Sequence, residues 1–538
     1  SGNVSGPNEA IGGLVGTNNG AINYSYASGL VAGGYGRIGG LVGLSNGSIL
    51  GSYATGDVSG TSREIGGLVG FNATGSISQS YATGQVSGPA GQVGALAGRN
   101  TGTLTDNYWN TETSGQASAV GDGSDDGTTG LTTAQMFDAA NFLGFDFADI
   151  WANADDQTTP YLRALAGNRV FNKNVLPDGT IDATNRPALY TVIQNVEQLQ
   201  AMRNNLTLNY LLGNHIDASA TAGWNGGAGF DPLGASNDRF SGQFDGLGYT
   251  VDSLTIQRPE QSGVGLFGYI GEGSSIRNLG LTNVDIRGQS FVGSLVGNSL
   301  GVLEGVFATG KLAADFVVGG LAGLSQGSIS ESYAATDIEA FSIAGGLVGS
   351  QGPGIYDSAT GTRRTSTIDN SYAAGTINVT VDPASGSAGG LVGVLDGAIS
   401  NSYSTVIIND AVARLLGSWN GGVLTNVYYA NTDRDGNALD AAGFDLGGRS
   451  WAEMTQLDTF STWDSDIDAQ GGTGSIWRIY EGYTTPLLRR FLTALNLNGG
   501  DTTTTYDGTE QSGSWSASAP YDADRIHGQA IGGRNAGT

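Results

Sequence analysis

The chain has 538 residues, with 91 glycines, no cysteine and 23 basic against 49 acidic side chains, which gives a net charge of −26. This charge argues against binding to nucleic acid or anionic membranes, because its field repels phosphate groups. The absence of cysteine excludes disulfides, thiolate metal sites and cysteine nucleophiles, and the glycines follow no G-X-Y period, which excludes collagen.

The tetrapeptide Gly-Leu-Val-Gly recurs at a near-constant interval in residues 1–110. Its leucines are Leu14, Leu41, Leu68 and Leu96, at spacings of 27, 27 and 28 residues. The motif around Leu96 is a variant. A fixed period of this size is typical of a solenoid in which each repeat forms one turn. The chain opens on residues that resemble the end of a repeat, so we expect it to be a piece of a longer protein.

Each repeat consists of short apolar, β-branched segments between polar corners such as Asn18-Asn19-Gly20. These segments favour strands, the corners favour tight turns, and no segment of the repeat has a helical period. Stacked coils of this kind predict an all-β fold, a right-handed parallel β-helix in which equivalent side chains lie about 4.8 Å apart.

Residues 111–166 do not continue the repeat. They hold a loop rich in Gly, Ser and Asp, a helix start at Thr132-Thr133 and the sequence Thr159-Pro160-Tyr161-Leu162. Because the open end of a solenoid exposes unpaired strands and apolar core, we expect this segment to be a lid on that end. Residues 1–166 are thus predicted as the first domain, and residues 167–187 as a linker.

Residues 188–491 repeat this plan and form the predicted second domain. A short capping helix is expected within residues 194–202, coils run from about residue 254 to residue 429, and a second lid contains Trp451, Trp477 and Thr485-Pro486. Residues 492–538 form a tail rich in Thr, Gly and Ser. The sequence therefore predicts two tandem β-helices with small capping segments that contain helices.

Aliphatic side chains recur at two positions of the coils and are predicted to stack inside them. Burial of each contributes roughly 1.5–3 kcal/mol, so a charge at these positions should break a coil. The predicted core residues are Leu14, Leu41, Leu68, Leu96, Ile22, Ile49, Ile77, Leu104, Leu295, Leu321, Leu347, Leu391, Ile329, Ile368 and Ile399.

An aromatic residue also recurs once in nearly every coil. This aromatic column consists of Tyr26, Tyr53, Tyr81, Tyr108, Phe307, Tyr333, Tyr372, Tyr403 and Tyr428. If it faced outward it could stack on sugar rings. A position that accepts Phe307, and Leu279 one coil earlier, does not require a hydroxyl, so we favour burial as an aromatic ladder in the core. Strand parity counts against burial, because Ser25 and Ala27, which flank Tyr26, share an alternation with Val31. Burial of the column therefore requires a bend.

The repeats resemble GLUG-motif repeats, which are named for Gly-Leu-any-Gly. The motif, the turn glycine, the Ser-Tyr-Ala-Thr-Gly run and the period agree over roughly residues 1–110 and 254–430. The resemblance implies a secreted bacterial surface protein similar to filamentous-haemagglutinin-like adhesins and to non-catalytic regions of immunoglobulin-A-specific metalloproteases. It brings no catalytic residues. The segment Tyr506-Asp507-Gly508-Thr509 resembles the start of a YDG-type β-sandwich module.

Candidate catalytic groups are few. The two histidines, His215 and His527, lie far apart in sequence, and His215 is interpreted as structural. A pair of carboxylates on one face could cleave polysaccharides, but the acidic residues of the coils do not recur in one column. We therefore predict no catalytic residue, no enzyme and no cofactor.

Two acidic loops resemble calcium-binding loops. The better one contains Asp433, Asp435 and Asn437, whose oxygen-bearing side chains occur at every second position, with a glycine between the last two. The position that should hold the closing glutamate is Phe444, so a solvated turn is the preferred interpretation and calcium the alternative.

The sequence thus predicts a structural or adhesive segment of a large secreted protein at the bacterial cell surface. Its stiff rod would present repeated surfaces to cell-surface glycans or proteins, or to other copies of the chain, through many weak contacts. The alternatives are a β-helical polysaccharide lyase or glycoside hydrolase and a self-assembling extracellular filament. No nucleic-acid partner is expected, and no membrane insertion, because no apolar run reaches about 18 residues.

Overall fold

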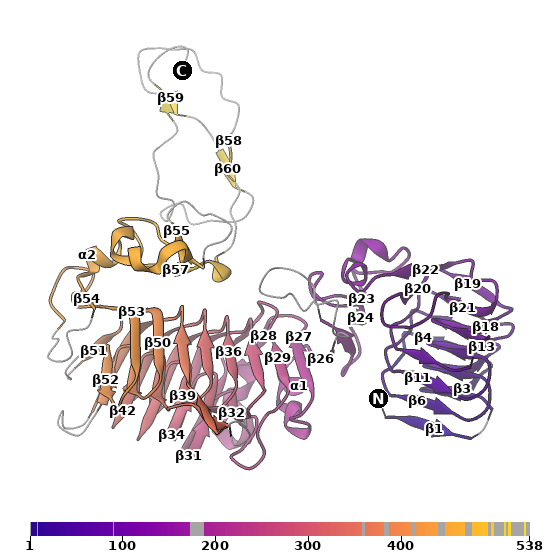
Figure 1. Cartoon of the computed structure of the whole chain (residues 1–538), viewed down its shortest axis with the longest axis horizontal. Helices are drawn as coiled ribbons and strands as arrows, with labels where there is room; N and C mark the ends of the chain where they lie inside the picture. The colour runs from indigo at the N-terminus through magenta and orange to yellow at the C-terminus, as the bar shows by residue number, and fades with distance from the viewer. Residues whose placement is uncertain are drawn as a thin grey trace.

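The computed structural model describes residues 2–7, 9–89, 91–172, 188–357, 361–380, 387–409, 415–439, 447–468 and 476–492, and four short strands in the tail. The predicted all-β fold is confirmed, because parallel strands wind into coils that stack as two solenoids (Figure 1). Most of the tail predicted at 492–538 lies outside the described residues, including Tyr506-Asp507-Gly508-Thr509 and His527. Its described strands are β58 (Leu497–Gly499), β59 (Gln511–Ser512), β60 (Trp515–Ala517) and β61 (Gly532–Gly533).

The first solenoid contains five parallel sheets, one at each position around the coil. Its first coil consists of β1 (Val4–Gly6), β2 (Ile11–Gly12), β3 (Val15–Asn18), β4 (Ala21–Asn23) and β5 (Tyr26–Ala27). The next coils add β6 (Val31–Gly33), β7 (Ile38–Gly39), β8 (Val42–Ser45), β9 (Ser48–Leu50), β10 (Tyr53–Ala54), β11 (Val58–Gly60), β12 (Ile65–Gly66), β13 (Val69–Asn72), β14 (Ser76–Ser78), β15 (Tyr81–Ala82), β16 (Val86–Ser87), β17 (Val93–Gly94), β18 (Ala97–Asn100), β19 (Thr103–Thr105) and β20 (Asn107–Asn110). Each residue pairs with its repeat equivalent, as Ile38 does with Ile65.

The small residues of the repeat have distinct roles in this stacking. A Cβ atom on Gly40 would collide with the carbonyl oxygen of Gly67 in the next coil, so the motif glycine permits close approach of the backbones. The serine before most tyrosines of the repeat links coils, because the backbone N–H of Ser25 donates to Ser52 Oγ at 3.1 Å and that of Ser52 donates to Ser80 Oγ at 3.0 Å. Steric fit and buried hydrogen bonds therefore account for the repeated Gly and Ser.

The second solenoid begins with β26 (Leu189–Ile193), a helical cap of α1 (Val196–Ala201) and η3 (Met202–Asn204), and the segment η4 (Ser219–Gly227). Its early strands are β27 (Asn209–Leu212), β28 (Ile216–Asp217), β29 (Gln243–Asp245), β30 (Thr250–Asp252), β31 (Thr255–Val264), β32 (Phe267–Ile270), β33 (Ser275–Arg277) and β34 (Gly280–Gly293). The middle coils contain β35 (Val296–Ser299), β36 (Val302–Glu304), β37 (Phe307–Ala314), β38 (Val317–Gly319), β39 (Ala322–Ser325), β40 (Ser328–Ser330), β41 (Tyr333–Ala340), β42 (Ile343–Gly345) and β43 (Val348–Gln351). The last coils contain β46 (Thr367–Asp369), β47 (Tyr372–Val379), β48 (Ser387–Gly389), β49 (Val392–Leu395), β50 (Ala398–Ser404), β51 (Ile407–Asn409), β52 (Leu416–Trp419), β53 (Val423–Ala430) and β54 (Gly448–Arg449).

One insertion interrupts these coils as a hairpin. It consists of β44 (Ile355–Asp357) and β45 (Thr362–Arg364), which pair antiparallel. The insertion follows β43 and leaves the stacking register intact, because Ile329 of β40 still pairs with Ile368 of β46. The long step in the repeat spacing is therefore an addition at a corner of the coil.

The predicted core residues lie inside the coils, each exposed by 9% or less, with one exception. Leu14 is 48% exposed although it occupies the same motif position as Leu41 and Leu68, which are fully buried. The coil that contains Leu14 has a described neighbour on one side, because β3 pairs with β8 alone. Burial of this motif leucine thus requires a coil on both sides, and the prediction for Leu14 is corrected.

The lids occupy a different place from the one predicted. In the first, β21 (Val120–Gly123) and β22 (Thr128–Leu131) extend the solenoid, and η1 (Gln135–Phe137), η2 (Ala139–Asn141), β23 (Trp151–Ala152) and β24 (Tyr161–Leu162) follow. In the second, α2 (Trp451–Met454) is followed by η5 (Leu457–Asp466), β55 (Ile467–Asp468), β56 (Trp477–Arg478), β57 (Leu487–Leu488) and η6 (Arg489–Phe491). Each lid lies along the side of its solenoid (Figure 1), where its apolar side chains pack on the aromatic column.

The predicted stiff rod is bent, because the two solenoids form an elbow. Their coils stack in directions that cross each other (Figure 1). The second solenoid starts from the lid on the side of the first, since β25 (Arg169–Phe171), inside the predicted linker, pairs antiparallel with β26. The chain therefore changes direction where the lid leaves the first solenoid.

Candidate functional site

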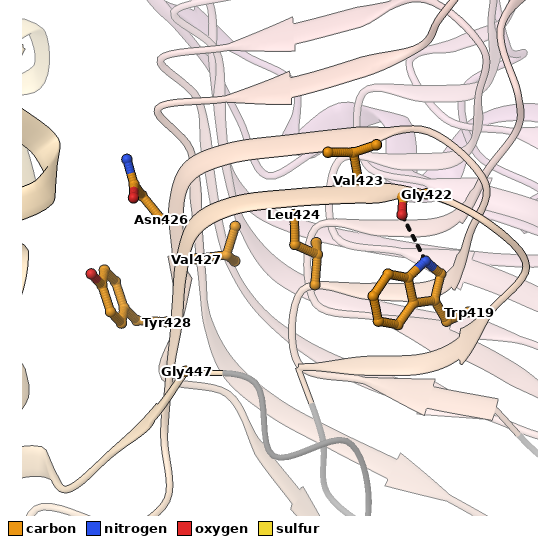
Figure 2. Close-up of a pocket in the computed structure, with 8 residues that line it drawn as sticks. All are labelled: Trp419, Gly422, Val423, Leu424, Asn426, Val427, Tyr428 and Gly447. Carbon is orange, nitrogen blue, oxygen red and sulfur yellow. Dashed lines mark hydrogen bonds between the residues drawn. The ribbon is translucent and has the colours of Figure 1, made fainter.

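The aromatic column is buried or partly buried, and it lies outside the coil interior. Tyr26, Tyr53 and Tyr81 stack with ring centroids 5.2 and 5.0 Å apart and form a cluster with lid residues that is separate from the core. Figure 2 shows the same arrangement in the last coil, where Tyr428 and Val427 point to opposite sides of β53. The prediction of an aromatic ladder within the core is corrected to a ladder between coil and lid.

A backbone bend turns these rings outward. The residue two places before each aromatic has a positive φ, as at Tyr24 (49°), Gly51 (57°) and Gln79 (50°). A left-handed residue interrupts the alternation of a strand. The rings thus lie on the side that strand parity favoured, and not in the core to which the predicted bend would have turned them.

The two lids hold their aromatic columns in the same way. The hydroxyl of Tyr81 donates to the carbonyl of Pro160 in the first lid, and that of Tyr403 donates to the carbonyl of Pro486 at 2.5 Å in the second. The indole of Trp151 packs on Tyr81, with ring centroids 6.0 Å apart, as that of Trp477 packs on Tyr403 at 5.8 Å. The column is thus the binding site of the lid and is closed to sugar rings.

Burial of these phenols makes the protein sensitive to alkaline pH. It raises the pKa of Tyr333 to about 12 and holds the pKa values of Tyr53 and Tyr372 well above 10. Since the folded pKa exceeds the unfolded value, stability is complete below about pH 9 and is lost as the pH rises through about 10 to 12. We expect the thermal unfolding midpoint to fall steeply over that range and to fall less in the double variant Tyr53→Phe, Tyr372→Phe. Equal slopes for the two proteins would contradict this assignment.

The structure accounts for the acidic loop at Asp433 by hydrogen bonds within the loop. The Asp433 carboxylate accepts the backbone N–H groups of Asp435 at 2.9 Å and Asn437 at 2.8 Å, and the Asn437 side-chain amide at 2.8 Å. These bonds hold the pKa of Asp433 below its usual value. Across the described residues no group of three or more His, Asp and Glu side chains could hold a metal. Calcium binding here stays a prediction.

His215 lies on the second solenoid beside Thr250. Its Nδ1 accepts the backbone N–H of Thr250 at 3.1 Å, and its ring meets Tyr249 edge-on with centroids 5.2 Å apart. The Tyr249 hydroxyl in turn donates to Asp155 of the first lid at 2.6 Å. This histidine therefore belongs to the packing where lid and second solenoid meet.

The second solenoid carries an exposed polar face on β31, β34, β37, β41, β47 and β51. Ile286, Leu312 and Ile338 of neighbouring strands point inward and are 1% exposed, and the residues on either side of them face solvent. The resulting two outward columns consist of Thr255, Asp285, Lys311, Asp337, Thr376 and Ile407, and of Gln257, Arg287, Ala313, Glu339, Asn378 and Asn409. A hollow of about 550 Å³ lies over them, which we call the ladder groove.

The groove brings together acidic residues that the sequence analysis treated as scattered. Asp285 and Asp337 stand in one column with Lys311 between them, at the 26-residue interval that also separates Leu295 from Leu321. That shared interval is the signal that could have revealed the column. Within the described part of the chain Lys311 makes no hydrogen bond or ion pair. Its ammonium group is available to a ligand.

A second hollow, of about 510 Å³, lies at the last coil of the second solenoid (Figure 2). Trp419, Val423, Leu424 and Val427 line it, and the Trp419 indole N–H donates to the carbonyl of Gly422 at 2.9 Å. The polar Asn426 side chain points away toward the lid and donates to the carbonyl of Thr462 at 3.0 Å. This hollow is therefore mainly apolar, and the ladder groove is the better candidate for recognising a polar ligand.

Comparison with known proteins confirms the GLUG resemblance. Residues 61–87, one repeat long, match the family described as the GLUG motif. A stretch of 134 residues, 23% of this chain, is 38% identical to halomucin of Haloquadratum walsbyi. Another of 119 residues, 21% of this chain, is 36% identical to a protein of Evansella cellulosilytica described as a Gly-rich membrane protein. The matches span 2% and 14% of the lengths of these relatives.

Proposed function

We propose that this chain is a structural, non-enzymatic segment of a secreted bacterial surface protein, which holds two solenoid arms at a fixed angle and presents their sides to other molecules. The GLUG match, the solenoid fold and a relative described as a membrane protein support a place at the cell surface. Of the described helices, none has the length and apolar character needed to cross a membrane. Cell-surface glycans, proteins or other copies of the chain are the partners of this proposal.

The observation that carries the proposal is the joint between the two arms, which is formed by the first lid and by the residues 167–172 that follow it. On one side, the hydroxyl of Tyr53 in the first solenoid donates to Asn168 Oδ1 at 2.7 Å. On the other, Asn172 donates to the buried carboxylate of Asp245 in the second solenoid at 2.8 Å. Val170 is fully buried in the apolar cluster at this joint. A joint with buried apolar and polar contacts resists bending, and a stiff joint suits a spacer at a surface.

The stiffness of the joint can be measured between two spin labels. The chain has no cysteine, so Ser59→Cys and Glu272→Cys, both exposed positions, introduce one label on each solenoid. We expect one narrow distribution of distances. Adding Val170→Asp places an unpaired charge in the joint and should broaden the distribution.

Val423→Asp is the matched control, because that valine is 62% exposed and lies far from the joint in the coil order. It should leave the distribution narrow. A broad distribution in the protein that carries the two labels alone would show independent arms and would refute the fixed elbow.

A further inference from the structure

The ladder groove has the chemistry to recognise a polymer of repeating hydroxyl groups. We propose that it binds a neutral linear polysaccharide laid along the axis of the second solenoid, across the strands. This inference deepens the proposed function and rests on it, because it names the partner that one arm would present itself to.

Hydrogen-bonding groups recur along the groove with a regular step. Neighbouring strands lie about 4.8 Å apart, so a chain that crosses them meets a fresh pair of side chains at each coil. Asp337 and Glu339 offer carboxylate oxygens to sugar hydroxyls, and Asn378 and Arg287 offer N–H groups. The inward neighbours of these side chains are locked in the core, so the step is rigid. A repeating ligand can then form many similar weak contacts.

The charges of the groove favour a neutral polymer. Asp285 and Asp337 flank Lys311, and Glu339 stands two strands from Arg287, so the lining has both signs close together. An anionic polymer would meet these acids on a chain of net charge −26. A peptide strand joins a sheet at an unpaired edge, whereas the central strands of this face, β34, β37, β41 and β47, pair on both sides. A chain of hydroxyl groups satisfies acceptors and donors alike without placing a charge beside either sign.

The hydrogen bonds already present leave part of this lining free for a ligand. Thr376 donates to Asp337 Oδ1 at 2.7 Å within one column, and Gln257 donates to Asp285 Oδ1 at 3.1 Å from the other column, so a neighbouring strand holds each carboxylate. Both aspartates are exposed to solvent. The side chains are thus held in place before a ligand arrives, which lowers the entropic cost of binding.

The first solenoid shows that this face is not a general property of the repeat. Glu339 stands six residues after Tyr333, and the residues six places after Tyr26, Tyr53 and Tyr81 are Ala32, Ser59 and Ser87. Those small side chains point outward from the same sheet position. At the position of Asp337 the first solenoid has Leu30, Asp57 and Gln85, so it keeps one outward column of longer side chains and lacks the second polar column that contains Glu339.

Binding of cello-, manno- and xylo-hexaose to the whole chain, measured by calorimetry, tests the proposal. We expect at least one of these neutral hexaoses to bind saturably, and to bind more tightly than its own disaccharide. The double variant Asp337→Asn, Glu339→Gln keeps side-chain volume and removes two charged acceptors, so we expect it to weaken that binding by about tenfold or more. Circular dichroism would check that the variant keeps its strand content.

The double variant Glu272→Gln, Asp238→Asn is the control, since it removes two exposed acids outside the groove and should leave the affinity unchanged. Three results would each overturn the proposal. They are tighter binding of hexagalacturonate than of every neutral hexaose, no saturable binding of any neutral hexaose, and equal affinity in the groove variant. Release of shorter sugars would overturn the non-enzymatic function as well. The spin-label distances test the elbow separately. A failure to bind glycans would therefore refute the glycan proposal without refuting the fixed elbow.

Discussion

Replacing Leu68 by aspartate is expected to unfold the first solenoid at temperatures where the parent chain is folded. Leu68 is fully buried, with coils on both sides of its own. The change removes a packed aliphatic side chain and leaves an unpaired carboxylate in the core, so we expect a loss of about 4 kcal/mol or more in the free energy of unfolding. Because each coil is stabilised by its neighbours, the damage should spread along the stack. Thermal unfolding followed by circular dichroism measures the loss.

The matched control is Leu14→Asp, which makes the same change at the same motif position. Leu14 is 48% exposed, so its carboxylate would reach water, and we expect a loss of about 1 kcal/mol or less. Similar losses in the two variants would mean that stacking on both sides does not set the burial of this leucine.

The contrast between Leu14 and Leu68 shows which structural features could be predicted from the sequence repeat and which could not. The interval between motif leucines fixes which residues lie above one another, and the observed pairing of Tyr53 with Tyr26 and Tyr81 follows it. The all-β fold, the parallel coils and the stacked columns were therefore predictable. The number of neighbours that a coil has is not written in its own residues, so equal motifs can have unequal burial.

The position of the lids could not be read from the repeat. Their contacts join residues far apart in the chain, such as Tyr81 and Pro160, which are 79 residues apart, and no periodic spacing indicates them. The elbow follows from these contacts and was missed for the same reason. Strand parity favoured the outward side for the aromatic column, but we predicted a bend that would turn it into the core. The bend in the structure lies two residues before each aromatic, at residues as different as Tyr24, Gly51 and Asp106, so no residue type marks it.

The ladder groove was missed because its residues vary from coil to coil. Inward positions repeat as aliphatic residues, since the core accepts little else, and so they stand out in a sequence. Outward positions change freely, as from Asp285 to Lys311. Only the register assembled from the inward positions shows that these different side chains form two columns. Candidate sites on solenoids are therefore best sought by applying the core interval to polar residues.

Replacing Trp477 by alanine is expected to detach the second lid while the coils beneath it stay folded. The Trp477 indole is fully buried, lies 4.9 Å from the ring of Trp463 and donates its N–H to Asn370 Oδ1 at 3.0 Å. The change opens a large cavity and leaves the amide oxygen of Asn370 without this donor, so we expect a loss of about 3–5 kcal/mol from the lid. Limited proteolysis should then cut within residues 450–491 while strand content, measured by circular dichroism, falls only slightly.

Trp419→Ala is the control of the same residue type, because that indole is 36% exposed at the last coil. The loss of unfolding free energy in Trp419→Ala should be smaller than that in Trp477→Ala by at least about 2 kcal/mol. The lid should stay resistant to protease. If Trp477→Ala unfolded coils and lid together, the lid would be part of one cooperative unit with the solenoid. The contacts between lid and aromatic column would then stabilise the whole arm. The interpretation of the lid as a cover that can detach from coils that are stable without it would be wrong.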